Sequence, residues 1–215
     1  MQETFQLCGH WTDDLNIMKL KQLESHLSQI RPFASPKIAF EQYPTSAHIA
    51  SLMMYSAQEA FEDIESCSIS DLGIGCGVLT IASCLLSSEF NRGFDIDAEA
   101  LAQTQENLSL FDLEESVDLV RTNVSDLVNL QEKECPPIHL SKCRTDTVIM
   151  NPPFGTKTQK GIDMVFLKAA TEMADHSIYT LHKSSTREVC WHVSNVHTNS
   201  WLIQKWWSSM FLKKD

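Results

Sequence analysis

The central part of the chain alternates short apolar segments with longer amphipathic ones, and this alternation limits the possible folds more than any other feature. The short segments, expected to be strands, are residues 68–72, 92–96, 117–124, 146–150 and 177–183. The longer segments, expected to be helices, are residues 78–86, 98–111 and 164–174. Alternation of this kind places helices on the crossovers between parallel strands. We therefore predict an α/β fold with a mostly parallel sheet.

Two further helices are expected before the first strand. Apolar residues recur at helical spacing over residues 18–30, and a second helix is predicted over residues 45–61 with Thr45 as its N-cap. Residues 1–16 are polar and irregular, and residues 189–215 are rich in tryptophan and show no clear periodicity. A chain of 215 residues can form one domain with a sizeable core and is too short for two of ordinary size.

The net charge of −11 is unevenly distributed along the chain. Residues 1–150 carry 9 basic and 23 acidic side chains, whereas residues 151–215 carry 8 basic and 5 acidic ones. Phosphate binding depends on clustered Lys and Arg. The total charge therefore argues against a general nucleic-acid coat protein, but the basic final third is compatible with a polyanionic substrate.

The seven cysteines are odd in number and form no CxxC pair. This pattern favours free thiols in a reducing compartment and predicts no zinc site. The N-terminus has no basic segment followed by an apolar run, and no stretch approaches the roughly 18 apolar residues of a membrane span. We expect a soluble intracellular protein.

A glycine-rich loop, DLGIGCG at residues 71–77, links the first expected strand to the following helix. Glycines let the backbone approach a ligand closely. The spacing differs from the dinucleotide fingerprint GxGxxG, because Val78 stands where its third glycine would be. Asp95 follows Gly73 by 22 residues, at the end of the second strand, where a carboxylate can accept hydrogen bonds from ribose hydroxyls. The alternative is a turn followed by a helix-capping Asp, but together these residues favour binding of a nucleoside cofactor.

The segment Asn151-Pro152-Pro153-Phe154 directly follows a buried apolar strand. At the carboxyl end of a central parallel strand it faces the ligand crevice. The Asn151 amide oxygen and the Pro152 carbonyl can both accept from one planar NH₂ group, and Phe154 can stack on the ring that carries it. This arrangement suits methyl transfer to an exocyclic amine, although consecutive prolines also occur in purely structural turns.

These motifs resemble those of class I methyltransferases that use S-adenosylmethionine, and more closely those of the adenine-N6 methyltransferases of small-subunit ribosomal RNA. The resemblance runs from about residue 18 to 188. It includes FEQYPT at 40–45, GFDID at 93–97, DTVIMNPPFGTK at 146–157 and LHKSSTRE at 181–188. It implies a Rossmann-like sheet with flanking helices, a methyltransferase domain over residues 17–188, and divergent ends at 1–16 and 189–215. It also implies a location in nucleus and cytoplasm.

The resemblance assigns roles to individual residues. Those expected to bind the cofactor are Gln42, Thr45, Gly73, Gly75, Cys76, Val78, Asp95, Asn123 and Val124. Those expected to hold the target base are Asn151, Pro152, Pro153 and Phe154. Basic residues after this motif could line an RNA path: Lys157, Lys160, Lys168, Lys183 and Arg187. The resemblance further implies a heterodimer with a small zinc-binding activator protein that covers an edge of the sheet.

The sequence departs from the family pattern in three places. Ile74 replaces a Cys in the glycine loop, which we expect to be neutral. Asn123 stands where the family has Asp, and the lost charge is expected to weaken cofactor binding. Residues after Glu188 do not match the last two strands of the family, so we expect those strands to be missing or altered.

Three other functions stay open at this point. A similar motif can hold the side-chain amide of a protein glutamine, although Phe154 in place of the Tyr common in such enzymes favours a base. The chain could also be a catalytically inactive variant that binds the cofactor or the activator. An NAD-dependent dehydrogenase is disfavoured by the glycine spacing.

Overall fold

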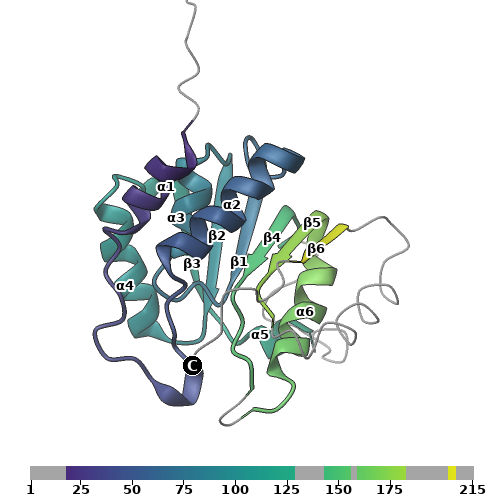
Figure 1. Ribbon diagram of the computed structural model, residues 1–215. Helices are drawn as coiled ribbons and strands as arrows, with labels where there is room; N and C mark the ends of the chain where they lie inside the picture. Colours follow the sequence, from purple (N-terminus) through teal and green to yellow (C-terminus); the bar gives the residue numbers. More distant parts are fainter. Residues whose placement is uncertain (1–17, 129–142, 156–158, 183–202, 207–215) are drawn as a thin grey trace, which may run out of the picture.

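The computed structural model describes residues 18–128, 143–155, 159–182 and 203–206. Within them the sheet has six strands in the order β3-β2-β1-β4-β5-β6, and every neighbouring pair is parallel. The strands are β1 (Ser68–Leu72), β2 (Phe90–Asp95), β3 (Val117–Arg121), β4 (Thr145–Met150), β5 (Ala174–Thr180) and β6 (Ile203–Trp206). The predicted parallel α/β fold is confirmed (Figure 1).

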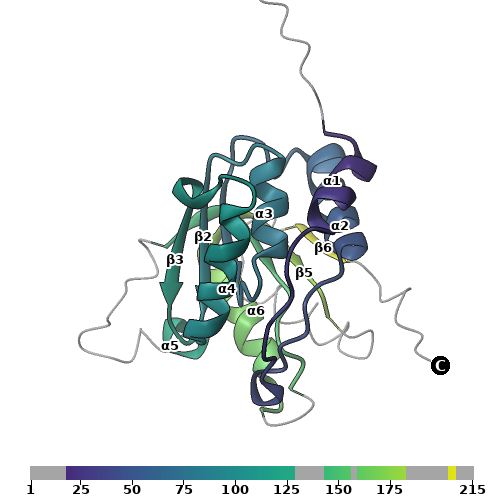
Figure 2. The same cartoon turned by 90° about the vertical axis from the view of Figure 1, so that its left-hand side faces the viewer.

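The described helices cover both faces of this sheet. They are α1 (Leu20–Leu27), α2 (Ala47–Phe61), α3 (Val78–Leu85), α4 (Ala98–Ser109), α5 (Val124–Val128) and α6 (Ile162–Met173), with short 3₁₀ turns η1 (Ile38–Phe40) and η2 (Glu114–Ser116). Figure 2 shows α3 and α4 in front of the sheet, with β3 at its edge. No helix among the described residues is long and apolar enough to cross a membrane.

Alternate residues of the central strands pack into two separate cores. Ile69 and Ile149 point to one face, where they join α1, α2 and α3. Leu72 and Val148 point to the other, where they meet α5 and α6. This is the period of two expected of strands that are buried on both sides. Because both faces of the sheet are buried, a ligand site can form only at the ends of the strands, and in parallel sheets it forms at their carboxyl ends.

Several element boundaries differ from the sequence-based expectation. The second helix is capped by Ser46, whose hydroxyl accepts a hydrogen bond from the backbone N–H of Ile49 at 3.3 Å, so the prediction of Thr45 as N-cap is wrong. The expected strand over residues 117–124 ends at Arg121, and Val124 instead begins α5. The first helix is shorter than predicted, and β5 begins earlier, at Ala174.

The C-terminal region supplies one strand that the sequence pattern did not reveal. Residues 203–206 form β6, which pairs in parallel with β5 from Ser177↔Ile203 to Thr180↔Trp206. Within the described residues β5 is therefore paired on both sides, by β4 and by β6. The remainder of the tail and residues 1–16 lie outside the described residues.

Candidate active site

A single pocket lies at the carboxyl ends of β1, β2 and β4 and brings most of the expected site residues together. Its lining includes Gln42, Thr45, Gly73, Gly75, Cys76, Val78, Asp95, Asn123, Val124, Asn151 and Pro153. Two expected base-binding residues do not line it: Pro152 is buried and Phe154 lies half-buried beside it. Parallel strands end at the same edge of a sheet, which is why residues so distant in sequence meet here.

The glycine loop has backbone angles and close neighbours that favour glycine. Gly73 and Gly75 have φ angles of 76° and 58°, a left-handed conformation that favours glycine. A Cβ atom on Gly73 would lie 3.1 Å from the Phe166 ring, and one on Gly75 would lie 3.1 Å from the Phe33 ring. The loop therefore lines the pocket and packs closely against two aromatic side chains.

Asp95 holds the loop from the neighbouring strand. One carboxylate oxygen accepts from the Gly75 N–H at 3.0 Å, and the other accepts from the Asp97 N–H at 2.9 Å. Burial raises the pKa of Asp95, and these bonds partly oppose that rise. Each oxygen has further acceptor capacity toward the pocket. The residue that caps α4 is Asp97, which accepts from the Glu99 N–H at 3.2 Å, so Asp95 is not a helix cap.

Asp71 and Cys76 bring contrasting chemistry to the same pocket. Asp71 is buried, and burial raises its pKa to about 7 even though one oxygen accepts from the Thr80 hydroxyl at 2.7 Å. Its other oxygen has no hydrogen-bond partner among the described residues. Burial also raises the pKa of Cys76 to about 12, so its thiol is neutral and a poor nucleophile.

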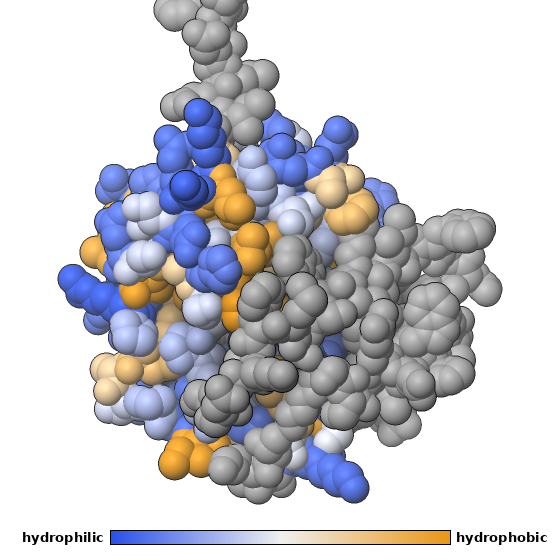
Figure 3. Space-filling model, in the orientation of Figure 1, coloured by the Kyte–Doolittle hydropathy of each residue, from blue (hydrophilic) through white to orange (hydrophobic). Residues whose placement is uncertain are grey.

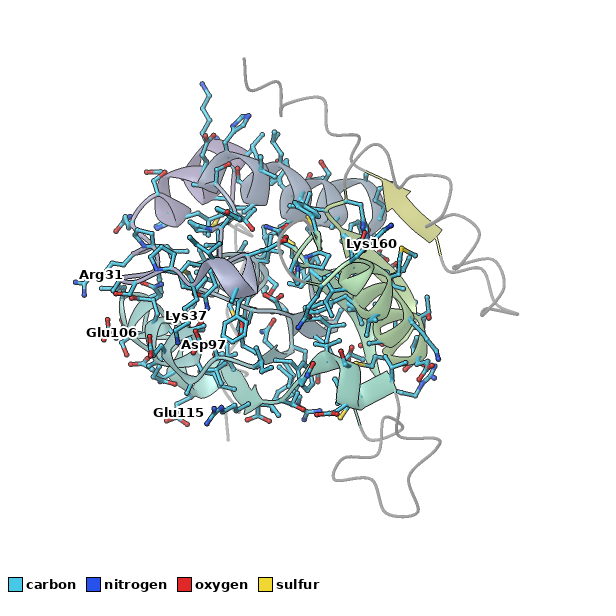
Figure 4. All side chains as sticks on the ribbon, turned by 90° about the horizontal axis from the view of Figure 1, so that it is seen from below. Arg31, Lys37, Asp97, Glu106, Glu115 and Lys160 are labelled. Carbon is cyan, nitrogen blue, oxygen red and sulfur yellow. The ribbon has the colours of Figure 1, made fainter. Side chains whose placement is uncertain are left out.

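Residues 33–45, which we call the strap, cross the mouth of this pocket. Figure 4 shows the Lys37 and Asp97 side chains close together. Lys37 Nζ donates to Asp97 Oδ1 at 2.7 Å, and Gln42 Nε2 donates to Asp97 Oδ2 at 2.7 Å. Gln42 Oε1 also accepts from the Lys37 N–H at 2.8 Å. Both the oxygen and the nitrogen of the Gln42 amide are therefore hydrogen-bonded, to Lys37 and Asp97.

The other end of the strap contacts the Asn-Pro-Pro-Phe segment. Asn151 Nδ2 donates to Thr45 Oγ1 at 3.0 Å, across 106 positions of sequence. The Phe154 N–H donates to Glu41 Oε2 at 2.7 Å. The strap therefore links Asp97, which follows β2, to the segment that follows β4.

Comparison with known proteins gives the family. A rRNA N(6)-adenosine-methyltransferase METTL5 of Danio rerio is 44% identical over 187 residues, covering 87% of this chain and 83% of the relative. A Drosophila melanogaster protein of the same name is 42% identical over 170 residues, with 79% and 75% covered. The chain belongs to the METTL5 family. It is accordingly a Rossmann-like methyltransferase, as the sequence motifs predicted.

Two further comparisons agree on this fold. The family model for ribosomal protein L11 methyltransferase (PrmA) matches residues 42–151, which run from the strap to Asn151. A crystal structure of a Pyrococcus horikoshii protein thought to be an RNA methyltransferase has a TM-score of 0.69 and 32% identity, covering 83% of this chain and 81% of that one. The METTL5 family matches extend well beyond the part shared with the L11 enzymes.

Asn123 lies at the pocket and directly before α5. Its side-chain oxygen accepts from the Ser125 N–H at 3.0 Å and so caps this short helix. Its remaining polar group is an NH₂ donor. An Asp at the same position would cap the helix with one oxygen and keep a second oxygen as an acceptor.

Sequence reasoning missed two polar residues of α4 that hold the glycine loop. Thr104 Oγ1 donates to the Gly75 carbonyl at 2.6 Å. Asn107, fully buried, donates to the carbonyls of Cys76 and Arg31, both at 2.9 Å. Polar residues in a helix usually face solvent, so only their spacing on the face that carries Ala100 and Leu108 hinted at burial.

Of the expected RNA contacts, Lys160 and Lys168 can be placed. Lys160 is exposed and adjoins Gln159, which lines the pocket (Figure 4). Lys157, Lys183 and Arg187 lie outside the described residues. No group of three or more His, Cys, Asp or Glu side chains that could hold a metal ion occurs in the described part of the chain.

Proposed function

We propose that the chain methylates the N6 amine of an adenosine in small-subunit ribosomal RNA, with S-adenosylmethionine as the methyl donor. The observation that carries the proposal is one pocket that contains the glycine loop, Asp95 and Asn151. Membership of the METTL5 family supports an rRNA adenosine as the substrate, since the fish and fly relatives carry that activity in their names.

The pocket residues fit S-adenosylmethionine. The positive-φ glycines line the pocket and carry no side chain, so the methionine part could lie along their backbone. The buried, unpartnered oxygen of Asp71 suits a cationic amino group. Asp95 keeps acceptor capacity for ribose hydroxyls. When bound, this cofactor supplies an electrophilic methyl group, and the neutral thiol of Cys76 does not compete for it.

Catalysis by the chain rests on positioning rather than on a strong base. The lone pair of an adenine amine is delocalised into the ring and is weakly nucleophilic. Acceptance of an amine hydrogen by Oδ1 of Asn151, which lines the pocket, favours the pyramidal geometry needed for in-line attack. The adenosine must leave its stack to enter the pocket, and stacking on Phe154 offsets part of that cost.

Methyl transfer from labelled S-adenosylmethionine tests the proposal directly. The purified chain with its activator is expected to label small-subunit rRNA, and Asn151→Ala is expected to abolish labelling. Gln105→Ala, an equivalent truncation of an exposed amide on α4, should retain activity. Label on a protein glutamine alone would favour the amide-methylating alternative. Cofactor-induced thermal stabilisation with no transfer would favour the inactive binding module.

We also propose the partner and RNA path implied by the family resemblance. A small zinc-binding activator would cover an edge of the sheet, and edge strands present unpaired backbone groups that a partner can use. In the described sheet these edges are β3 and β6. Lys160 would meet RNA phosphates beside the pocket. Co-purification with the activator, and a weaker salt dependence of RNA binding for Lys160→Gln, test these two points.

An intracellular location, in nucleus and cytoplasm, is part of the same proposal. The described cysteines, Cys67, Cys76, Cys84 and Cys143, are free thiols, which suits a reducing compartment. Fractionation of cells that express the tagged chain would test this location.

A further inference from the structure

Glu41 is the strap residue whose side chain holds the backbone of the Asn-Pro-Pro-Phe segment. Its Oε2 atom accepts a hydrogen bond from the Phe154 N–H at 2.7 Å, across 113 positions of sequence. A backbone N–H can only donate and a carboxylate can only accept, so this bond has one direction. Bonds from an N–H to a carboxylate are also stronger than those between neutral groups.

The Phe154 N–H is the first backbone donor after Asn151. Pro152 and Pro153 have no N–H, so neither can be held by a bond of this kind. Directly after Phe154 the chain turns at Gly155, which has a φ angle of 66°, and a Cβ atom there would lie 2.4 Å from the Gln159 carbonyl oxygen. The bond to Glu41 therefore fixes the point at which the rigid proline pair ends and the Phe154 side chain begins.

The backbone of Glu41 has a conformation that glutamate rarely adopts. Its φ and ψ angles of 50° and 44° are left-handed, at the end of the η1 turn. Glycine adopts this conformation freely, and asparagine tolerates it better than glutamate does. The turn by itself therefore does not favour a glutamate at this position, whereas the contact with the Phe154 N–H makes use of its long, acidic side chain.

The strap has a second attachment that does not involve the Glu41 side chain. Lys37 and Gln42, which precede and follow Glu41 in the sequence, both donate to the Asp97 carboxylate at 2.7 Å. Asp97 is only 7% exposed. Gln42 and Thr45, the strap residues expected to contact the cofactor, both line the pocket. Removal of the Glu41 carboxylate is thus expected to release the segment after β4 and to leave the cofactor side of the strap in place.

We propose that Glu41 is a positioning residue for the target base. Its carboxylate holds the Phe154 backbone, and so keeps Asn151 and Phe154 where the NH₂ group and the ring of the base meet them. The assignment rests on the proposed function and leaves the expected cofactor contacts of the strap unchanged. A displacement of about 1 Å in a positioning group can cost about a hundredfold in rate, so release of one of the contacts that hold the segment is expected to cost about tenfold.

The test compares two variants of Glu41 in the full chain with its activator. Glu41→Asn suits the left-handed backbone but is one methylene group too short to reach the Phe154 N–H, whereas Glu41→Gln keeps an oxygen that can accept from it. Glu41→Asn is expected to lower kcat/KM for rRNA by about tenfold, with little change in the Kd for S-adenosylmethionine. Glu41→Gln is expected to retain most of the wild-type value. Equal losses in both variants, full activity in Glu41→Asn, or a loss explained by a raised cofactor Kd would overturn the assignment.

A second measurement does not depend on activity. Without RNA, the nuclear magnetic resonance signal of the Phe154 amide proton should move upfield in Glu41→Asn and move less in Glu41→Gln. Glu59→Asn, the same change at an exposed position of α2, is the control and should alter neither this signal nor kcat/KM. An unchanged signal in Glu41→Asn would contradict the proposed hydrogen bond. Failure of the wild-type chain to methylate rRNA would instead overturn the proposed function, and the resonance result distinguishes the two failures.

Discussion

At the scale of single residues, Asn123 and Ile74 show how one side chain affects its surroundings through particular atoms. Asn123 uses its side-chain oxygen to cap α5, so it offers the pocket an NH₂ donor and no charged acceptor. Ile74 extends across β2, where a Cβ atom on Gly93 would lie 2.1 Å from its Cδ1. Asn123 affects which groups of a ligand can bind, whereas Ile74 limits which side chain the neighbouring strand can carry at residue 93.

Asn123→Asp is expected to tighten binding of S-adenosylmethionine by about threefold to tenfold. An Asp keeps the helix cap and adds an ionised acceptor for the amine of the cofactor adenine, and charge-assisted hydrogen bonds are the stronger ones. Isothermal titration calorimetry of the two proteins gives the comparison. Asn123→Ser, which keeps a capping oxygen without the charge, is the control and should not tighten binding. Equal affinity for Asn and Asp would show that this side chain does not meet the adenine.

Gly93→Ala is expected to destabilise the protein by about 1–3 kcal/mol, because the new methyl group overlaps Ile74 in a closely packed site. Ile74→Val removes the colliding Cδ1 atom, so the double variant should lose less than the sum of the single changes. Urea unfolding of the four proteins measures this coupling. If the destabilisation of the double variant equals the sum of the two single losses, Ile74 moves away from the new methyl group at no cost in free energy.

At the scale of elements, the strap contributes many of the residues that line the pocket. Its course could not be predicted from the sequence. Its backbone includes the η1 turn and no longer element. Its apolar side chains Ile38, Phe40 and Tyr43 are exposed by 70%, 39% and 63%. In Figure 3 apolar surface shows at the foot of the molecule, where Figure 1 places this segment. Polar contacts with Asp97 therefore carry much of its attachment.

Lys37→Met is expected to loosen the strap and to speed hydrogen exchange in residues 38–42. The variant keeps the aliphatic length of lysine but loses the bonds from Nζ to Asp97 at 2.7 Å and Glu99 at 3.1 Å. Lys21→Met, on the exposed side of α1, is the matched control and should leave strap exchange unchanged. Hydrogen exchange followed by mass spectrometry resolves this segment. Unchanged exchange in Lys37→Met would show that Gln42 alone is a sufficient anchor.

The elements with strong periodicity could be predicted from the sequence, whereas contacts between distant segments could not. The strand ending at Leu72 and the helix beginning at Val78 follow from apolar period and a glycine break. Thr45 and Ser46 are both good N-caps, and only the tertiary contact of Thr45 with Asn151 distinguishes them. The expected site residues converge because their strands are parallel. No local sequence pattern predicts that Asn107 hydrogen-bonds both Arg31, just before the strap, and Cys76 of the glycine loop.

At the scale of the whole molecule, opposing titrations decide how stability depends on pH. Asp97 and Asp146 have lowered pKa values in the folded state, so their stabilising contributions are present above about pH 4 and are lost in acid. Asp71 behaves oppositely, because burial raises its pKa to about 7. Burial also lowers the pKa of His182, so its charging disfavours the folded state in acid.

Asp71 is expected to make the folded protein less stable as pH rises from 5 to 8. Its folded pKa of about 7 exceeds the unfolded value of 3.8, so the folded state binds more protons in this range and loses that advantage as the proton leaves. Asp71→Asn cannot ionise and still presents an oxygen to the Thr80 hydroxyl, which donates at 2.7 Å. The urea midpoint of Asp71→Asn without cofactor, compared with that of wild type, should therefore be more favourable at pH 8 than at pH 5. The titrations of Asp95 and His182 occur in both proteins and largely cancel in the difference. If the stability difference between variant and wild type is the same at both pH values, Asp71 is already ionised in the folded protein at pH 5. Groups of the pocket would then stabilise its buried charge.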